Sequence, residues 1–89
     1  MHEPNLVVYT NSLIACPYCV RAKKALTDRG YDFEERDVAD PAMKAGLRSK
    51  RPSARTVPQI FLMNDYYIGG CDDLLRIIDQ LDTLIHLNT

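Results

Sequence analysis

The segment LVVYTNSLIACPYCVRAKKAL, residues 6–26, contains the transition that decides the fold. It begins with a short run rich in β-branched residues, Leu6 to Thr10, which predicts a buried strand. Two cysteines, Cys16 and Cys19, follow, and from Pro17 to Arg29 apolar and basic residues interleave at helical spacing. Proline suits the first turn of a helix, and a glycine after Arg29 supplies a C-terminal stop. The segment therefore predicts a strand, a loop carrying two thiols and an amphipathic helix.

Similar patterns assign the middle of the chain. Asp32 to Asp37 alternates enough for a second strand. Asp40 followed by Pro41 is a cap and first-turn signal for a second helix that reaches roughly Lys50. Two further strands are expected in QIFLM (59–63) and DYYIGG (65–70), with a hairpin turn at Asn64-Asp65.

The last segment, CDDLLRIIDQLDTLIHLN (71–88), has leucine and isoleucine at helical spacing and two acidic residues at its start. It predicts one helix that closes the domain. The resulting order is β-α-β-α-β-β-α. The first strand-helix-strand unit requires a right-handed parallel crossover, while the late hairpin adds an antiparallel pair. We therefore expect an α/β fold with a four-stranded mixed sheet flanked by three helices.

Length and composition limit the function classes. A chain of 89 residues leaves room for one core, so residues 1–89 are expected to form a single domain. Hydrophobic residues make up 46% of the chain and charged residues 26%, a globular balance. The formal net charge of -1 argues against nucleic acid or an anionic membrane as a partner. The start, MHEPNLVVYT, lacks the pattern of a signal peptide, so we expect a cytoplasmic protein.

Three cysteines, Cys16, Cys19 and Cys71, cannot all pair within the chain, which favours a reducing compartment. In such a compartment, a close cysteine pair is more often catalytic or metal-binding than structural. Cys16 is expected just before the first helical turn, where unpaired N–H groups and the helix dipole favour a thiolate. Cys19 falls on the same helix face one turn later and can reach the sulfur of Cys16. The pair can therefore form a reversible disulfide, with Cys16 attacking and Cys19 resolving.

Two alternatives compete with this redox interpretation. Zinc sites also use C-x-x-C, but they need about four ligands, and the remaining candidates, Cys71, His2 and His86, form no spaced partner motif. Two buried, inert cysteines are the other alternative, because free cysteine is often just a small hydrophobic residue. The intervening proline and the basic helix that follows argue against it.

Three motifs in this order, CPYC (16–19), TVPQIF (56–61) and GGCDD (69–73), resemble the signatures of dithiol glutaredoxins, a family with the thioredoxin-like fold. Thioredoxins proper typically have a tryptophan at the active site, and this sequence has none. The resemblance covers nearly the whole chain. It implies a glutathione-disulfide oxidoreductase with Cys16 and Cys19 as catalytic residues.

The resemblance also implies a glutathione site. Val57-Pro58 matches the family's cis-proline loop, in which the Val57 backbone pairs with the cysteine part of glutathione, although an ordinary trans proline opening a strand is the alternative. Asp72 would take the α-ammonium group of the γ-glutamyl end, and Asp73 would cap the helix. The residues predicted to bind glutathione are Tyr18, Thr56, Val57, Pro58, Gly70, Cys71 and Asp72, with Cys71 contributing its backbone only.

Charge near the thiols departs from the family pattern. Glutaredoxins commonly carry a lysine shortly before the first cysteine, whereas NSLIA (11–15) is longer and has no cation. From Pro41 through Arg55 there are five basic residues and no acid, which would favour an anionic ligand such as glutathione. A solvated helix face is the alternative for most of them. The five are Lys44, Arg48, Lys50, Arg51 and Arg55.

The resemblance leads to expectations about partners. Glutathione is expected as a co-substrate, with no tightly bound cofactor and no metal. The protein substrates are expected to be disulfide-bearing or glutathionylated proteins, with ribonucleotide reductase among the candidate electron acceptors, and the chain is expected to be a monomer. An iron-sulfur carrier, in which Cys16 from two chains and two glutathiones hold a cluster, is the alternative from another functional class, but proline after the first cysteine generally accompanies the redox role.

Overall fold

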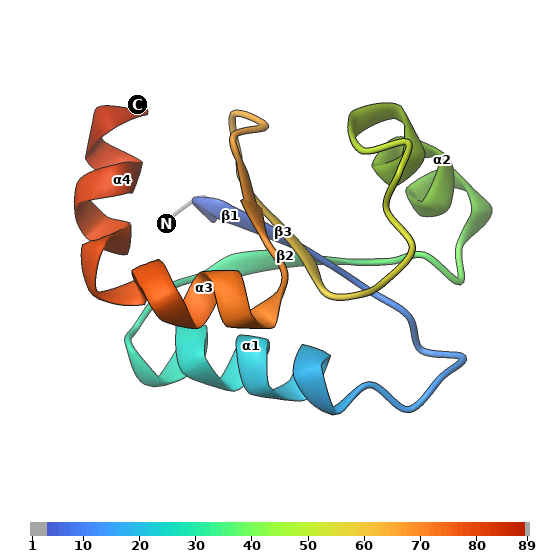
Figure 1. Cartoon of the computed structure of the whole chain (residues 1–89), viewed down its shortest axis with the longest axis horizontal. Helices are drawn as coiled ribbons and strands as arrows, with labels where there is room; N and C mark the ends of the chain where they lie inside the picture. Colours follow the sequence, from blue (N-terminus) through green and yellow to red (C-terminus); the bar gives the residue numbers. More distant parts are fainter. Residues whose placement is uncertain (1–3, 89) are drawn as a thin grey trace.

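Strand β1 (Leu6–Thr10) is fully buried in the middle of the sheet, as its apolar run predicts. In this computed structural model, which describes residues 4–88, β1 pairs in parallel with β2 (Phe33–Asp37) and antiparallel with β3 (Gln59–Leu62). Strand β4 (Tyr67–Gly69) continues the sheet antiparallel to β3, so the spatial order is β2-β1-β3-β4 (Figure 1). The parallel crossover and the antiparallel hairpin are both confirmed, and with them the mixed four-stranded sheet.

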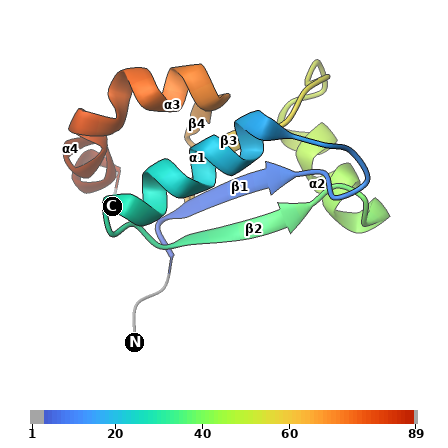
Figure 2. The same ribbon diagram turned by 90° about the horizontal axis from the view of Figure 1, so that it is seen from below.

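The helices cover both faces of this sheet. Helices α1 (Pro17–Asp28) and α3 (Cys71–Ile77) lie on one face and α2 (Pro41–Lys50) on the other, as Figures 1 and 2 show. Successive side chains of a strand point to opposite faces. Accordingly, Leu6 and Val8 of β1 belong to the core cluster beneath α1 and α3. Val7 and Tyr9 belong to the cluster beneath α2. The buried strand thus anchors both layers of helices.

Helices α1 and α2 begin where the sequence predicts. Pro17 and Pro41 occupy first-turn positions, and the Asp40 carboxylate accepts a hydrogen bond of 2.9 Å from the Ala42 N–H. This side-chain cap satisfies one of the N–H groups that a helix start leaves unpaired. The cap of α1 is unusual because the residue in that position is Cys16. The first helix therefore begins at the pair of cysteines.

The hairpin is confirmed, with shorter strands than the sequence suggests. Asp65 has a φ of 74° and turns the chain, and the Leu62 N–H donates to the Tyr66 carbonyl at 2.8 Å. Aspartate tolerates this left-handed conformation better than most residues. The Tyr66 N–H donates to the Asn64 side chain at 3.2 Å, so the turn itself takes up residues at the predicted strand ends.

The C-terminal segment differs from the single helix that its periodicity predicts. Helix α3 is followed by a short 3₁₀ turn, η1 (Ile78–Gln80), and by α4 (Leu81–Leu87), which turns away from α3 (Figure 1). The bend places Leu81 and Ile85 in the core cluster beside the sheet. Burial of these apolar side chains in the core stabilises the bent arrangement.

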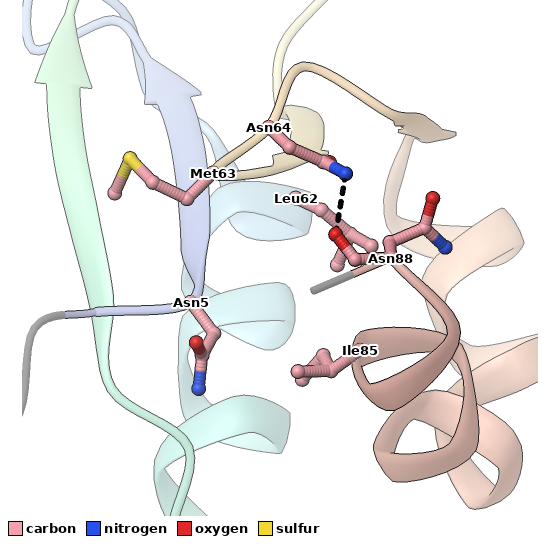
Figure 3. Close-up of a pocket in the computed structure, with 6 residues that line it drawn as sticks. All are labelled: Asn5, Leu62, Met63, Asn64, Ile85 and Asn88. Atoms are coloured by element: carbon pink, nitrogen blue, oxygen red, sulfur yellow. Dashed lines mark hydrogen bonds between the residues drawn. The ribbon is translucent and has the colours of Figure 1, made fainter.

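Contacts at the end of the chain hold α4 in this position. The Asn64 side chain donates to the Asn88 carbonyl at 2.8 Å, and Ile85 lies beside Leu62 in a pocket that Asn5 and Met63 also line (Figure 3). The hairpin turn and the last helical turn are thereby joined. Within residues 4–88, no helix combines the length and apolar character needed to cross a membrane.

Replacing Leu81 by alanine tests the packing of α4. Leu81 is fully buried, so Leu81→Ala is expected to lower the free energy of unfolding by about 2–5 kcal/mol, measured by urea denaturation. Leu87→Ala in the same helix is the control, because Leu87 is 78% exposed. This substitution should change the free energy of unfolding by no more than about 0.5 kcal/mol. Equal effects of the two substitutions would contradict the packing of α4 on the sheet.

Candidate active site

Cys16 occupies the N-cap position of α1. Its Sγ accepts a hydrogen bond of 3.2 Å from the Cys19 N–H, in the place where a serine or aspartate oxygen usually caps a helix. A hydrogen bond of this kind stabilises a negative charge on sulfur, as does the positive end of the helix dipole. The expected location of Cys16 before the first helical turn is confirmed, and a thiolate formed there on reduction would receive both contributions.

The two cysteines form a disulfide with their Cα atoms 5.2 Å apart. Cys16 is partly exposed, whereas Cys19 is only 4% exposed because it lies one turn further along α1, on the side facing the core. An incoming sulfur can therefore reach Cys16 and not Cys19. The predicted proximity of the pair is confirmed.

The loop before β3 approaches the sulfur from the other side. Val57-Pro58 is a cis peptide bond, as the motif predicts, and the Val57 carbonyl oxygen lies 3.6 Å from the Cys16 Sγ. The Gln59 side chain donates to the Thr56 carbonyl at 2.9 Å and accepts a hydrogen bond from the Tyr67 hydroxyl at 2.6 Å. These bonds attach the loop to β3 and β4. Tertiary contacts thus bring a backbone segment 41 residues distant in sequence to the reactive sulfur.

A shallow cavity of about 300 Å³ opens beside this loop. It gathers all seven residues predicted to bind glutathione, which come from the start of α1, the cis-proline loop and the start of α3. We call it the cis-proline shelf, and Asp73 is its one additional lining residue. The shelf is lined by Tyr18, Thr56, Val57, Pro58, Gly70, Cys71, Asp72 and Asp73.

The two aspartates of the shelf have different surroundings. Asp73 accepts a hydrogen bond of 3.1 Å from the Gly70 N–H, and so it caps the start of α3 as predicted. Within residues 4–88, the carboxylate of Asp72 has no hydrogen-bonding partner and is exposed. Gly69 has a φ of 128°, and a Cβ there would collide with the Asp73 carboxylate. The first glycine of the motif therefore makes room for the cap, whereas the second lines the shelf.

A larger cavity of about 560 Å³, the basic groove, lies between α2 and the loop that precedes Cys16. Lys44, Arg48 and Arg55 line it together with the apolar Leu47 and with Cys16. Of the described residues 4–88, no carboxylate lines this groove, and its three cations make the lining positive. The sequence alone did not show which of the five basic residues would face the thiols. Lys44 and Arg48 are four residues apart, so they share one face of α2.

The remaining two cations of the run point elsewhere. Lys50 forms an ion pair with Asp65 and lies 5.6 Å from the centre of the Phe61 ring. Arg51 stacks on Tyr67, 4.0 Å from the ring centre. Such cation-π contacts contribute to packing on the α2 face of the sheet. These two residues support the fold and do not line the groove.

The loop that replaces the family's lysine is anchored by Asp37 at the end of β2. The Asp37 carboxylate accepts hydrogen bonds from the N–H groups of Ser12 and Ala39, at 3.0 and 2.9 Å. The side chain of Ser12 and these backbone donors lower the pKa of Asp37. The loop also exposes two apolar side chains, Leu13 and Ile14. It contributes shape and apolar surface where the family commonly has a charge.

A third cavity, which we call the α1 hollow, was not found by sequence reasoning. It measures about 210 Å³ and lies between α1, β2 and the loop, with Ile14, Cys16 and Val20 in its lining. Lys23 and Glu35 line it as well and form an ion pair of 3.0 Å. The sequence offered one signal for this cavity: Cys16, Val20 and Lys23 follow one another at helical spacing and so share a face of α1. The strand that completes the hollow is distant in sequence, so the cavity itself could not be predicted.

The described residues offer neither a metal site nor a second reactive thiol. Within residues 4–88, no group of three or more His, Cys, Asp or Glu side chains could hold a metal ion, and His2 lies outside the described residues. Cys71 is buried, and desolvation raises the pKa of its thiol, while Arg21 lowers that pKa and Asp72 raises it. A thiol with a raised pKa is a poor nucleophile at neutral pH.

The Cys71 thiol is therefore expected to react slowly. In a Cys16→Ser/Cys19→Ser variant, alkylation of Cys71 by iodoacetamide at neutral pH should be at least about tenfold slower in the folded protein than in denaturant, because burial limits both access and ionisation. Mass spectrometry over time measures the rate. Equal rates in the folded and unfolded states would show that Cys71 is accessible and reactive.

Comparison with known proteins agrees with this geometry. The family model named Glutaredoxin matches residues 6–67. A glutaredoxin of Pseudomonas aeruginosa is 42% identical over 85 residues, covering 92% of this chain and 96% of that protein. The solution structure of a glutaredoxin from Brucella melitensis superposes with a TM-score of 0.73 at 37% identity, covering 97% of this chain and 92% of that one.

A second similar structure contains a ligand. The crystal structure of a buckwheat glutaredoxin-glutathione complex superposes with a TM-score of 0.67 at 29% identity, covering 85% of this chain and 69% of that one. Together with the disulfide at the start of α1 and the cis-proline beside it, these similarities establish what kind of protein this is. The chain belongs to the glutaredoxin family, with its thioredoxin-like fold, and is a thiol-disulfide oxidoreductase.

Proposed function

We propose that this protein uses glutathione to reduce protein disulfides and glutathione mixed disulfides through Cys16 and Cys19. The observation that carries the proposal is the position of Cys16, whose sulfur caps α1 and borders the basic groove, with the cis-proline shelf alongside. A dithiol beside two sites suited to a peptide with two carboxylates fits glutathione better than a large apolar ligand. The resemblance to a glutaredoxin-glutathione complex supports the same choice.

Cys16 is the nucleophile in this proposal. It is the more exposed of the two sulfurs, and the Cys19 N–H together with the start of α1 stabilises its thiolate. With a glutathione mixed disulfide, the Cys16 thiolate attacks the glutathione sulfur and the substrate leaves as a thiolate, which takes a proton from solvent. A second glutathione thiolate then attacks the Cys16-glutathione disulfide. It releases oxidised glutathione and restores the Cys16 thiolate.

With a protein disulfide, both cysteines take part. Cys16 attacks one sulfur of the substrate and forms a mixed disulfide, and the Cys19 thiolate then attacks Cys16. This step releases the reduced substrate dithiol and leaves the Cys16-Cys19 disulfide. Two glutathione molecules return the enzyme to its dithiol form as they are oxidised to one disulfide. The short separation of the two Cα atoms, 5.2 Å, suits the intramolecular step.

Glutathione lies along the cis-proline shelf in this proposal. The Val57 N–H has no hydrogen-bonding partner among residues 4–88, so it can pair with the cysteine part of glutathione as a sheet edge pairs with a peptide. The Asp72 carboxylate has no partner there either and is placed to take the α-ammonium group. Tyr18 borders both the shelf and the groove and provides an aromatic wall between them.

The basic groove binds the glycine carboxylate. Lys44 and Arg48 form no ion pair among residues 4–88, whereas Arg55 donates to the carbonyls of Pro52 and Ala54 at 3.4 Å. The first two cations are therefore the freer ones. They supply the positive charge that the family commonly places before the first cysteine, and we assign the glycine end to them.

The physiological acceptors are disulfide-bearing or glutathionylated proteins in the cytoplasm, with ribonucleotide reductase as a candidate. Reduction of such a partner requires both thiols, because a disulfide within the acceptor is exchanged for the one between Cys16 and Cys19. Glutaredoxin potentials of about -200 to -230 mV lie close to the cytosolic glutathione potential, so the reaction can run in either direction. We propose that the protein acts as a monomer without a resident metal.

Exchange of each cysteine for serine tests the roles of the two thiols. Cys16→Ser should reduce deglutathionylation of a mixed disulfide to background, because no nucleophile remains at the entrance. Cys19→Ser should retain this activity and lose reduction of protein disulfides. A coupled assay with glutathione, glutathione reductase and NADPH measures both. Retention of activity in Cys16→Ser with loss in Cys19→Ser would reverse the assignment.

Charge removal tests the basic groove. Lys44→Ala and Arg48→Ala should each raise the KM for glutathione about two- to fivefold with a smaller change in kcat, because an exposed charge contact contributes a modest binding energy. Added salt should narrow the difference from wild type. Lys24→Ala is the control, since Lys24 pairs with Asp28 outside the groove. An unchanged KM in both groove variants would contradict the assignment.

A further inference from the structure

We propose that the α1 hollow and the apolar side chains around it bind the protein part of the substrate: an extended segment with apolar residues next to its target cysteine. This inference rests on the proposed function and specifies its substrate class. It concerns a surface separate from the cis-proline shelf. We call this surface the apolar patch and define it by Leu13, Ile14 and Val20.

Exposed hydrophobic side chains are concentrated at this patch. Among residues 4–88, eight large hydrophobic side chains are exposed, and four of them lie in the single stretch from residue 13 to residue 20. Leu13 is 78% exposed, Ile14 54% and Val20 62%. Single exposed hydrophobic side chains are ordinary, but Ile14 and Val20 line the α1 hollow together with Cys16, and Leu13 is the neighbour of Ile14 in the chain. A group of exposed apolar side chains next to a cavity that contains the Cys16 sulfur indicates a binding surface.

The patch lies where the second half of a mixed disulfide must go. Cys16 lines both the basic groove and the α1 hollow, whereas Val20 lines the hollow alone. When the glutathione half of a substrate occupies the shelf and the groove, the other half is attached through sulfur and leaves the site by another side. The hollow, with Ile14 and Val20 in its lining, is a second cavity that Cys16 borders.

The chemistry of the hollow favours an apolar side chain. Its two charged residues neutralise each other, because Lys23 pairs with Glu35 at 3.0 Å and the Thr10 hydroxyl donates to the same carboxylate at 2.8 Å. These groups need no charged ligand. A volume of about 210 Å³ suits one or two side chains of a peptide and no folded element. Burial of such side chains against the patch would add affinity for protein substrates that small disulfides cannot obtain.

Two peptides test the inference. Each carries one cysteine in disulfide linkage to glutathione, and they differ only in the two flanking residues, leucine in one and serine in the other. The wild-type protein should turn over the leucine peptide with a kcat/KM about tenfold higher, as expected for burial of a large aliphatic side chain. In Leu13→Ser/Val20→Ser, the ratio should fall towards one, while turnover of the glutathione-mercaptoethanol mixed disulfide stays at the wild-type rate.

Leu87→Ser is the matched control, since Leu87 has the same 78% exposure as Leu13 and lies in α4, and its ratio should equal that of wild type. A ratio near one in wild type, or an unchanged ratio in the double variant, would overturn this inference and leave the proposed function intact. Failure to turn over any glutathione mixed disulfide would overturn the proposed function and this inference with it. If the wild-type protein were a dimer and the double variant a monomer, the patch would be the contact between two copies of the chain. That result would also overturn the inference.

Discussion

The hydrogen bond from the Cys19 N–H to the Cys16 sulfur is the interaction on which this active site depends. It makes the reactive group a part of the helix start, in the position that a capping oxygen usually fills. One backbone donor therefore serves two purposes. It satisfies an N–H that α1 leaves unpaired, and it stabilises the charge that the nucleophile must carry. The helix cannot begin elsewhere without removing that support.

The three cavities around the thiol pair differ in character. The cis-proline shelf offers unpaired backbone and an unpaired carboxylate, the basic groove offers cations, and the α1 hollow offers an apolar edge over a neutralised ion pair. A substrate with a peptide on each side of a disulfide presents two different halves to the enzyme. In the functions proposed above, the two halves bind in different cavities and exchange takes place at the partly exposed Cys16 sulfur between them.

The loop before Cys16 departs most from the family pattern. It lacks the usual cation and exposes Leu13 and Ile14, and Asp37 holds it through backbone hydrogen bonds. Hydrogen-bond donors from Ser12 and Ala39 lower the pKa of Asp37, and so they favour the charged form of the anchoring carboxylate. Positive charge comes instead from α2 across the groove. The loop is thereby free to contribute apolar contacts.

Local patterns predicted much of this structure. The strand at Leu6 to Thr10, the capped starts of α1 and α2, and the helical spacing of the two thiols follow from interactions within a few residues, which the sequence contains directly. The resemblance of the three motifs to glutaredoxin signatures also predicted the residues that line the shelf. Their placement around one cavity was an expectation until the fold brought α1, the cis-proline loop and α3 side by side.

Tertiary structure alone decided the remaining features. The tail keeps its helical period through Ile78 to Gln80, yet it bends there because Leu81 and Ile85 gain burial against the sheet. Likewise, only the packing of α2 directs Lys44 and Arg48 into the groove while Lys50 and Arg51 turn to aromatic rings. The sequence by itself predicted the cysteine pair, its position at the start of the first helix and the order of the strands through short-range chemistry. Which cations and which apolar side chains surround the sulfur depended on contacts between distant segments, and those exist only in the folded chain.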